Sequence, residues 1–194
     1  MYLTFTATAG QNMGLALSDL VTPNTTNFAY LTVYRPDGNV LGSQYCYVNN
    51  NGCQTNLINL EAGTYSVVIT PPYDGDQTMS FKSTLSTDVT GTLVADKVQT
   101  LTLGRRGQNG RLSFVGTAGQ TVALQVAGQT TVPAGRGVYY TVYKPDGTAW
   151  NSAAPTSATT LNLPNLPMTG TYTVFVDPYY GETLSTQLTL TSLK

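Results

Sequence analysis

Apolar and polar residues alternate along most of this chain, which is the two-residue period of a β-strand with one buried face. The clearest runs cover residues 3–7, 13–17, 29–33 and 63–69, and then 112–116, 122–126, 140–143 and 170–176. Residues that favour turns separate the runs, and no stretch has the period of an amphipathic helix. The pattern predicts an all-β protein.

The order of the runs repeats within the chain. Residues 3–11 match residues 112–120 with an offset of 112 − 3 = 109, and residues 63–69 match residues 170–176 with an offset of 170 − 63 = 107. A Pro-Asp-Gly turn follows a strand in both halves, at Pro36 and at Pro145. The repeat therefore predicts two tandem antiparallel β-sandwich modules, immunoglobulin-like or jelly-roll-like with Greek-key connections.

We place the first module at residues 1–86 and the second at 111–194, with residues 87–110 as linker strands that belong to the second module. These linker strands have no counterpart in the first half. Either the chain is one part of a longer array, or the first module has an open sheet edge that a strand from a neighbour completes.

Tyr65 and Tyr172 each follow Gly-Thr at the start of a strongly alternating strand. A tyrosine at this place in a Greek-key sandwich turns its hydroxyl group back onto the preceding corner. We therefore interpret both as core and corner residues rather than as ligand contacts.

Charge is scarce and balanced, with nine basic and ten acidic residues. The one local basic cluster, Arg105, Arg106 and Arg111, is interpreted as a solvated turn between modules rather than as a phosphate site, so we expect no nucleic-acid partner. No stretch approaches the roughly 20 apolar residues of a membrane span. Few charges with many hydroxyl and amide groups are typical of proteins that work outside the cell.

Cys46 and Cys53 are separated by six residues that include Asn51-Gly52. Because Asn-Gly favours a tight hairpin turn, we predict that the two sulfur atoms meet across a hairpin and form one local disulfide. The bridge indicates an oxidising compartment.

The sequence offers few groups for catalysis, because it contains no histidine and the disulfide uses both cysteines. Two carboxylate pairs remain, Asp74 with Asp76 and Asp177 with Glu182, and both are interpreted as solvated loop residues. We therefore predict no catalytic residues and no obligatory cofactor. Calcium is the metal that suits the compact turn at Asp74 and Asp76, although the other acidic positions of a calcium loop are missing.

Aromatic residues at strand ends and in loops form the candidate ligand platform. Flat rings with a polar edge suit both sugar rings and protein contacts. The alternative is packing at a module end or junction. The platform consists of Tyr73, Trp150, Tyr179 and Tyr180, with Tyr45 and Tyr47 on the disulfide hairpin as further surface candidates.

Several of these segments together resemble a known family: residues 3–11, the Val-Tyr-Arg-Pro-Asp-Gly turn, residues 63–71 and the Asp-Val-Thr-Gly-Thr-Leu linker. They are similar to the bacterial pre-peptidase C-terminal (PPC) domains, β-sandwich repeats of large secreted and cell-surface proteins. The resemblance covers nearly the whole chain and implies non-catalytic roles such as spacing, or binding of collagen or polysaccharide, with calcium in some members.

We therefore expect a non-catalytic extracellular segment of a secreted or cell-surface bacterial repeat protein, with a structural or adhesive role. Its partners would be neighbouring modules or subunits that contact its sheet edges, and strand donation between subunits would build a filament. The alternative is an accessory module that binds carbohydrate or an extracellular protein for a secreted hydrolase.

Overall fold

The structure is a computed structural model of the 194-residue chain, and it describes residues 1–23, 28–50, 52–71 and 78–193. The chain divides into two compact units, Met1–Thr87 and Asp88–Lys194, which we call module 1 and module 2. The described residues lie mostly in strands, with the short 3-10 turns η1 (Val48–Asn50) and η2 (Tyr179–Gly181) as the helical elements. The predicted all-β fold of tandem sandwiches is confirmed.

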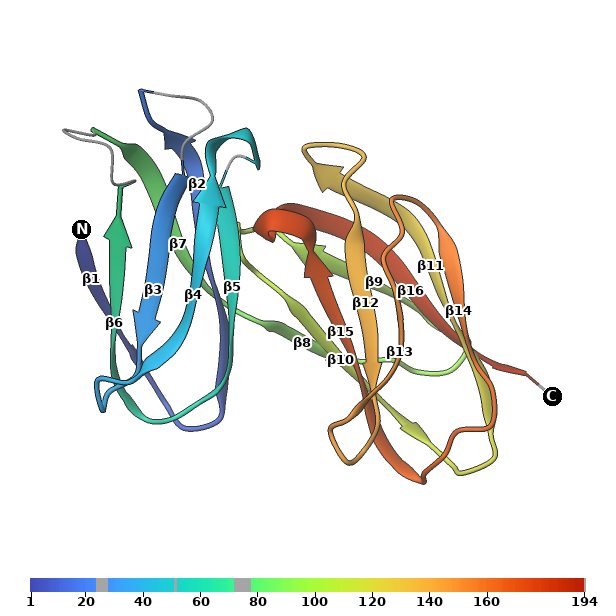
Figure 1. Cartoon of the computed structure of the whole chain (residues 1–194). Helices are drawn as coiled ribbons and strands as arrows, with labels where there is room; N and C mark the ends of the chain where they lie inside the picture. The colour runs from blue at the N-terminus through green and yellow to red at the C-terminus, as the bar shows by residue number, and fades with distance from the viewer. Residues whose placement is uncertain (24–27, 51, 72–77, 194) are drawn as a thin grey trace. The chain divides into compact units, whose positions relative to one another are not determined.

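Module 1 is a sandwich of seven strands (Figure 1). They are β1 (Tyr2–Ala7), β2 (Gln11–Val21), β3 (Phe28–Tyr34), β4 (Val40–Tyr47), β5 (Gly52–Leu60), β6 (Gly63–Thr70) and β7 (Ser80–Thr87). Their order is β1-β6-β3-β4-β5-β2-β7. Because the described residues of β4 and β5 pair only through Tyr47 and Gly52, the strand order divides there into two layers, β1-β6-β3-β4 and β5-β2-β7.

Module 2 repeats the seven strands and adds two more (Figure 1). The added strands are β8 (Val89–Thr92) and β9 (Val98–Leu103). The others are β10 (Gly110–Gly116), β11 (Thr121–Val132), β12 (Val138–Tyr143), β13 (Ala149–Ala153), β14 (Thr159–Leu163), β15 (Gly170–Pro178) and β16 (Thr183–Leu193). One sheet has the order β13-β12-β15-β10-β8, and the other has the order β14-β11-β16-β9.

The duplication extends to strand register. Phe5 lies opposite Tyr65 across β1 and β6, and their stacked ring centroids are 5.1 Å apart. Phe114 and Tyr172 repeat this pair across β10 and β15, also at 5.1 Å. The bulge in β2 between residues 18 and 21 recurs in β11 between residues 127 and 130, at the same offset of 109.

The two repeated motifs contact each other in the fold. A side chain at Gly63 would come within 2.6 Å of the Pro36 ring, and one at Gly170 within 2.9 Å of the Pro145 ring. Both glycines also have a positive φ, near 150°, which L-residues rarely adopt. The Gly-Thr-Tyr strand therefore starts with glycine because it packs against the Pro-Asp-Gly turn.

Both tyrosine corners predicted from the sequence are present. The hydroxyl group of Tyr65 accepts a hydrogen bond from the amide of Glu61 at 3.0 Å and donates one to its carbonyl oxygen at 3.2 Å. Tyr172 makes the same two bonds to Met168, at 3.2 and 2.7 Å. Both tyrosine side chains are fully buried, so each corner is fixed from inside its module.

The disulfide between Cys46 and Cys53 is present, with the two Cα atoms 4.8 Å apart. Its setting differs from the expected tight hairpin, because the 3-10 turn η1 follows β4 and the two cysteines lie on strands of different layers. Both cysteines are buried. The bridge therefore ties the two layers of module 1 together at one end of the sandwich.

Candidate functional site

One side of module 1 differs from the equivalent side of module 2. Among the described residues, strand β1 pairs with β6 alone, and β7 pairs with β2 alone. Their counterparts β10 and β16 each have a second partner, because β8 pairs with β10 in parallel and β9 pairs with β16 antiparallel. The two sheets of module 2 are therefore each extended by one strand, whereas module 1 ends with β1 and β7 as open edges.

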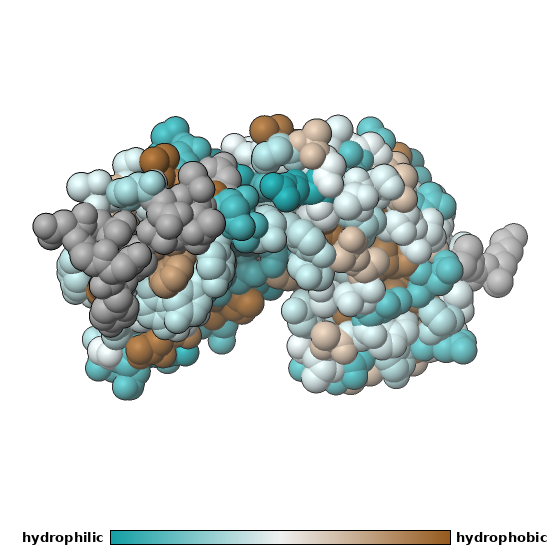
Figure 2. All heavy atoms as spheres, turned by 45° about the horizontal axis from the view of Figure 1, so that its top comes forward, coloured by the Kyte–Doolittle hydropathy of each residue, from teal (hydrophilic) through white to brown (hydrophobic). Residues whose placement is uncertain are grey.

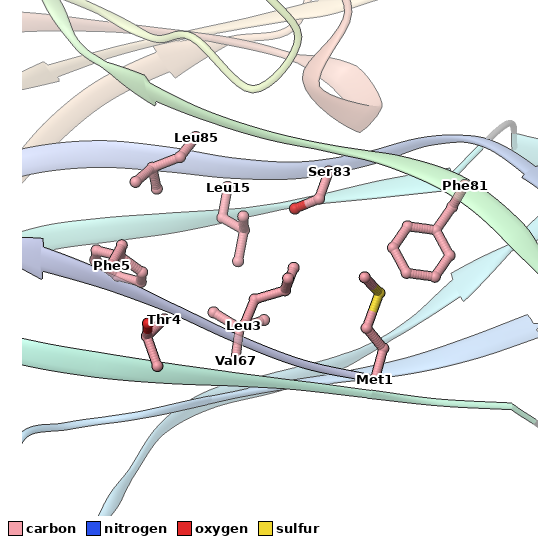
Figure 3. A pocket seen from close by; sticks show the side chains of 9 residues that line it. All are labelled: Met1, Leu3, Thr4, Phe5, Leu15, Val67, Phe81, Ser83 and Leu85. Atoms are coloured by element: carbon pink, nitrogen blue, oxygen red, sulfur yellow. The ribbon is translucent and has the colours of Figure 1, made fainter.

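An apolar groove lies between these edges. It has a volume of about 320 Å³, and Figure 3 shows side chains from β1 and β7 that point into it from opposite sides. The lining residues are Met1, Leu3, Thr4, Phe5, Leu15, Val67, Phe81, Ser83 and Leu85. Leu3, Phe5 and Leu85 pack against the core and remain half-buried. The groove is thus an uncovered part of the apolar layer.

The backbone of β1 presents hydrogen-bonding groups along this edge. Met1 exchanges hydrogen bonds with Ile69 of β6, so the odd residues of β1 bond to β6 and the even ones point the other way. In module 2 the residue equivalent to Thr4 is Ser113, whose carbonyl oxygen accepts a 2.7 Å bond from the amide of Leu93. Tyr2 and Thr4 therefore direct their backbone groups toward the side on which a further strand would pair.

A second candidate is an aromatic cluster on the outer face of module 1. Phe28 and Tyr30 of β3 lie opposite Tyr47 and Tyr45 of β4. The centroids of Phe28 and Tyr45 are 4.8 Å apart, and those of Tyr30 and Tyr45 are 4.9 Å apart. Tyr45 is 53% exposed and Tyr47 is 41% exposed. The sequence analysis predicted only Tyr45 and Tyr47 as surface candidates. Phe28 and Tyr30 alternate with Ala29 and Leu31 along β3, and this alternation indicates that the two aromatic rings share the outer face.

Module 2 carries a smaller aromatic cluster at one end. Tyr179 lies 4.6 Å from Tyr139 and 6.3 Å from Tyr180, measured between ring centroids. The guanidinium group of Arg136 lies 5.7 Å from the centre of the Tyr180 ring. Tyr180 has a left-handed backbone, with φ 54°, which is uncommon for a bulky residue. The structure thus brings together Tyr179 and Tyr180 of the predicted platform.

The remaining platform residues lie elsewhere. Trp150, on β13, is half-buried against the core of module 2, with its ring centroid 6.1 Å from that of Tyr172. Its position is that of a core residue at the sandwich edge. Tyr73 lies outside the described residues, as do Asp74 and Asp76, the candidate calcium ligands.

The expectation that Asp177 and Glu182 are solvated loop residues is wrong: Asp177 lies on β15 and is half-buried, and Glu182 is buried. The Glu182 side chain is 1% exposed, and its Oε1 atom lies 3.3 Å from Nε of Arg136. Burial raises the pKa of the Glu182 carboxyl group, while the charges of Arg136 and Arg106 oppose that shift. Glu182, directly after η2, therefore forms an ion pair in which its carboxylate is buried and the Arg136 side chain is partly exposed. Groups of three or more residues suited to a metal ion are absent from the described part of the chain.

The interpretation of the basic cluster as a solvated turn is wrong for Arg111. Arg111 is not solvated: its Nε atom lies 2.6 Å from Oδ2 of the buried Asp88, and its guanidinium group lies 4.3 Å from the centre of the Phe175 ring. Asp88 immediately precedes β8, so this ion pair helps to hold β8 against β10.

Figure 2 shows that residues of intermediate hydropathy cover most of the visible face, in keeping with the few charges in the sequence. No helix in the described part of the chain has the length and hydrophobicity needed to span a membrane.

The comparisons with known proteins give matches at the level of architecture. No protein-family model and no curated protein matches the chain. Among solved structures, the periplasmic inhibitor of g-type lysozyme from Aeromonas hydrophila is 18% identical, with a TM-score of 0.40 over 55% of this chain and 99% of that one. The pre-peptidase C-terminal domain of a Bacillus anthracis collagenase is 13% identical, with a TM-score of 0.42 over 53% and 95%.

A carbohydrate-binding module of the β-sandwich superfamily is 11% identical and has a TM-score of 0.32, with 100% of this chain and 97% of that chain covered. With identities of 18% or less and TM-scores of 0.42 or less, we take no function from these similarities. The chain has a β-sandwich architecture that also occurs in PPC-like domains, inhibitors and carbohydrate-binding modules.

Proposed function

We propose that this chain is a non-catalytic structural segment of a secreted or cell-surface protein, and that it is joined to a neighbouring module or subunit through the open edges of module 1. One observation carries the proposal: in the part of the chain that the structure describes, β1 and β7 have no second strand partner, whereas the equivalent strands of module 2 pair with β8 and β9. Natural proteins usually protect such edges, since unpaired backbone groups recruit other strands.

The edges of module 1 have little such protection. Strand β7 contains neither a proline nor an inward-pointing charge, and its Lys82 forms a surface ion pair with Asp19 at 2.7 Å. A short or charged edge discourages pairing, whereas β1 and β7 have six and eight residues and Lys82 is the one charged side chain on these two strands. Strand addition at these edges gives main-chain hydrogen bonds, and the groove between them accepts apolar side chains.

An extracellular setting agrees with the chemistry of the chain. Both cysteines are joined in a buried disulfide, and such bridges persist in oxidising compartments. If each subunit of an assembly both donates and receives a strand, the contact is heterologous, and repetition of a heterologous contact produces a ring or a filament. A filament built by strand donation is therefore the specific form of the proposal.

The test is a pair of proline substitutions on β1. Thr4→Pro removes an outward-facing amide and keeps the bonds to β6, because proline is tolerated where the N–H group faces away from the sheet. Thr6→Pro is the matched control, since Thr6 also faces outward but lies beyond the four residues that pair with β8 in module 2. Tagged variants are expressed in cells that produce the protein, and their incorporation into large assemblies is measured by sedimentation. We expect Thr4→Pro to be excluded at least tenfold more than Thr6→Pro; equal incorporation contradicts the proposal.

The second candidate function is that of an accessory binding module, and the aromatic cluster at Phe28, Tyr30, Tyr45 and Tyr47 supports it. Stacked, half-exposed rings on a rigid sheet suit sugar rings or a protein surface. Retention on insoluble polysaccharides is measured for Tyr45→Ala and Tyr180→Ala, which probe the two clusters separately. Loss of retention with intact folding supports this function, and unchanged retention removes it.

A further inference from the structure

The segment that closes module 2 shows what kind of chain would close module 1. Residues 88–104 run along β10 as β8, turn, and return along β16 as β9. Leu93, Leu101 and Leu103 of this segment are between 0% and 4% exposed and belong to the core of module 2. The segment therefore consists of two strands, β8 and β9, that cover the side of module 2 whose equivalent is open in module 1.

The strand registers map one module onto the other. Met1 of module 1 is equivalent to Gly110 of module 2. Met1 bonds to Ile69 of β6, and Gly110 lies opposite Val176 of β15; Ile69 and Val176 are equivalent at the offset of 107. On the other edge, residues of β7 and β16 correspond at an offset of 192 − 87 = 105, since Met13 pairs with Thr87 and its counterpart Val122 pairs with Ser192.

At two pairs of equivalent positions, the residues of the two modules differ in size in a way that changes the shape of the groove. At Gly110, an added Cβ would lie 2.7 Å from the Cδ2 atom of Leu101, so glycine is what gives Leu101 its space. Module 1 has Met1 at this position, and the Met1 side chain lines the groove.

The strand partner of Leu101 is Thr186, and the residue of module 1 at that position is Phe81. Figure 3 shows Met1 and Phe81 pointing toward each other at the same end of the groove. The two positions that flank Leu101 in module 2, Gly110 and Thr186, therefore carry the larger side chains Met1 and Phe81 in module 1.

Two residues further along β7 the difference in side-chain size is reversed. Leu188 of β16 lies opposite Gln99, and its counterpart on β7 is the smaller Ser83, which also lines the groove. The groove is therefore narrower than in module 2 at the place of Leu101 and wider at the place of Gln99. Its apolar lining is otherwise shared, since Leu3 and Phe5 correspond to Leu112 and Phe114.

We propose that the groove of module 1 binds an extended segment of a neighbouring polypeptide that is built like residues 88–104 but has a small side chain at the position of Leu101. The part of this segment that corresponds to β8 pairs in parallel with Met1–Thr4 of β1, and the part that corresponds to β9 pairs antiparallel with β7. This inference rests on the proposed function and adds the occupant's orientation and side-chain pattern. From this pattern we expect residues 88–104 of another copy to fit less well, because Leu101 would meet Met1 and Phe81.

Synthetic peptides test the pattern on the full chain. Peptide A has the sequence of residues 88–104, and peptide B has the same sequence with Leu101→Ala. A control peptide combines Leu101→Ala with Leu93→Asp, which places a charge on a side chain that is buried in module 2. Affinity is measured by isothermal titration calorimetry, and amide shifts of β1 and β7 are followed by NMR. We expect peptide B to bind at least tenfold more tightly than peptide A, and the control peptide to bind at least tenfold more weakly than peptide B.

A change in the protein supplies the reciprocal test. Phe81→Thr gives module 1 the residue that module 2 has at that position, so we expect the preference for peptide B to shrink at least threefold. Thr4→Pro should weaken both peptides, whereas Thr6→Pro should weaken neither.

The possible outcomes separate the two proposals. If peptide A binds as tightly as peptide B, or if Phe81→Thr leaves the preference unchanged, the side-chain pattern is wrong while edge pairing still stands. If neither peptide binds, the occupant is not of the 88–104 type, and this inference fails whatever the assembly assay shows. If neither peptide binds and Thr4→Pro and Thr6→Pro are incorporated equally into assemblies, the proposed function fails as well.

Discussion

Alanine substitution of two equivalent leucines would show how much the covering segment, residues 88–104, contributes to the stability of a module. Leu190 of β16 is 5% exposed, and its backbone is bridged by the chain between β8 and β9 at Ala95. Its counterpart Leu85 on β7 lines the open groove and is only half-buried. Truncation to alanine removes similar atoms in both modules, so the two costs differ because of the cover.

The magnitudes follow from burial. Removal of three buried carbon atoms from Leu190 costs about 2.4 kcal/mol at about 0.8 kcal/mol each, and the enclosed cavity brings the total to about 3–4 kcal/mol. At Leu85 the removed atoms widen an open groove instead of leaving a cavity, and part of their surface is already in water. We therefore expect Leu85→Ala to cost about 1–2 kcal/mol.

We expect calorimetry of the full chain to show separate unfolding transitions for the two compact units, and fluorescence to assign them. The chain has one tryptophan, Trp150, which packs on the core of module 2 and so reports that module alone. At about 4–8 °C per kcal/mol, Leu190→Ala should lower the midpoint of module 2 by more than about 10 °C. Gln187→Ala, at an exposed position of the same strand, is the control. Equal losses for Leu85→Ala and Leu190→Ala would refute the reasoning.

Three further predictions concern single modules. Tyr65→Phe and Tyr172→Phe each remove a hydroxyl group that makes two backbone bonds, so each should cost about 1–3 kcal/mol in its own module alone, as measured by calorimetry. Cys46→Ser with Cys53→Ser opens a loop with a sequence separation of 7; the chain-entropy relation gives a loss of roughly 2.5 kcal/mol, and a shift in the Trp150 transition would contradict its assignment to module 1. Burial raises the pKa of Glu182, so its ionisation costs more in the folded state than in the unfolded one. Stability of module 2 relative to Glu182→Gln should therefore be highest below the usual value of 4.5 and fall as the pH rises through the raised pKa; a pH-independent difference would count against this.

Much of the fold could be predicted because its determinants are local. The Pro-Asp-Gly turns need residues that tolerate particular φ values, and the Gly-Thr-Tyr starts need glycine next to a proline ring and a hydroxyl group near its own corner. Each of these requirements can be read from a few neighbouring residues. Their repetition at offsets of 109 and 107 then predicts the order of the strands.

The candidate site depends on pairings that no local pattern encodes. The linker strands were expected from their alternation, but the sequence does not indicate that β8 and β9 would extend different sheets of module 2. That Met1 takes the place of Gly110, and Phe81 the place of Thr186, can be recognised only once the strand register is known. For the same reason, the solvated turn expected at Arg111 is wrong, because its partner Asp88 is 23 residues away.

The central claim is that the groove between β1 and β7 receives a strand from a neighbour, and the structure of the protein in its native assembly tests it most directly. Electron cryomicroscopy of assemblies isolated from producing cells would show the contents of the groove. We predict density for an extended segment parallel to β1 and antiparallel to β7, with a small side chain beside Met1 and Phe81. Assemblies in which the groove is open to solvent, and in which the subunits meet through other surfaces, would contradict the account.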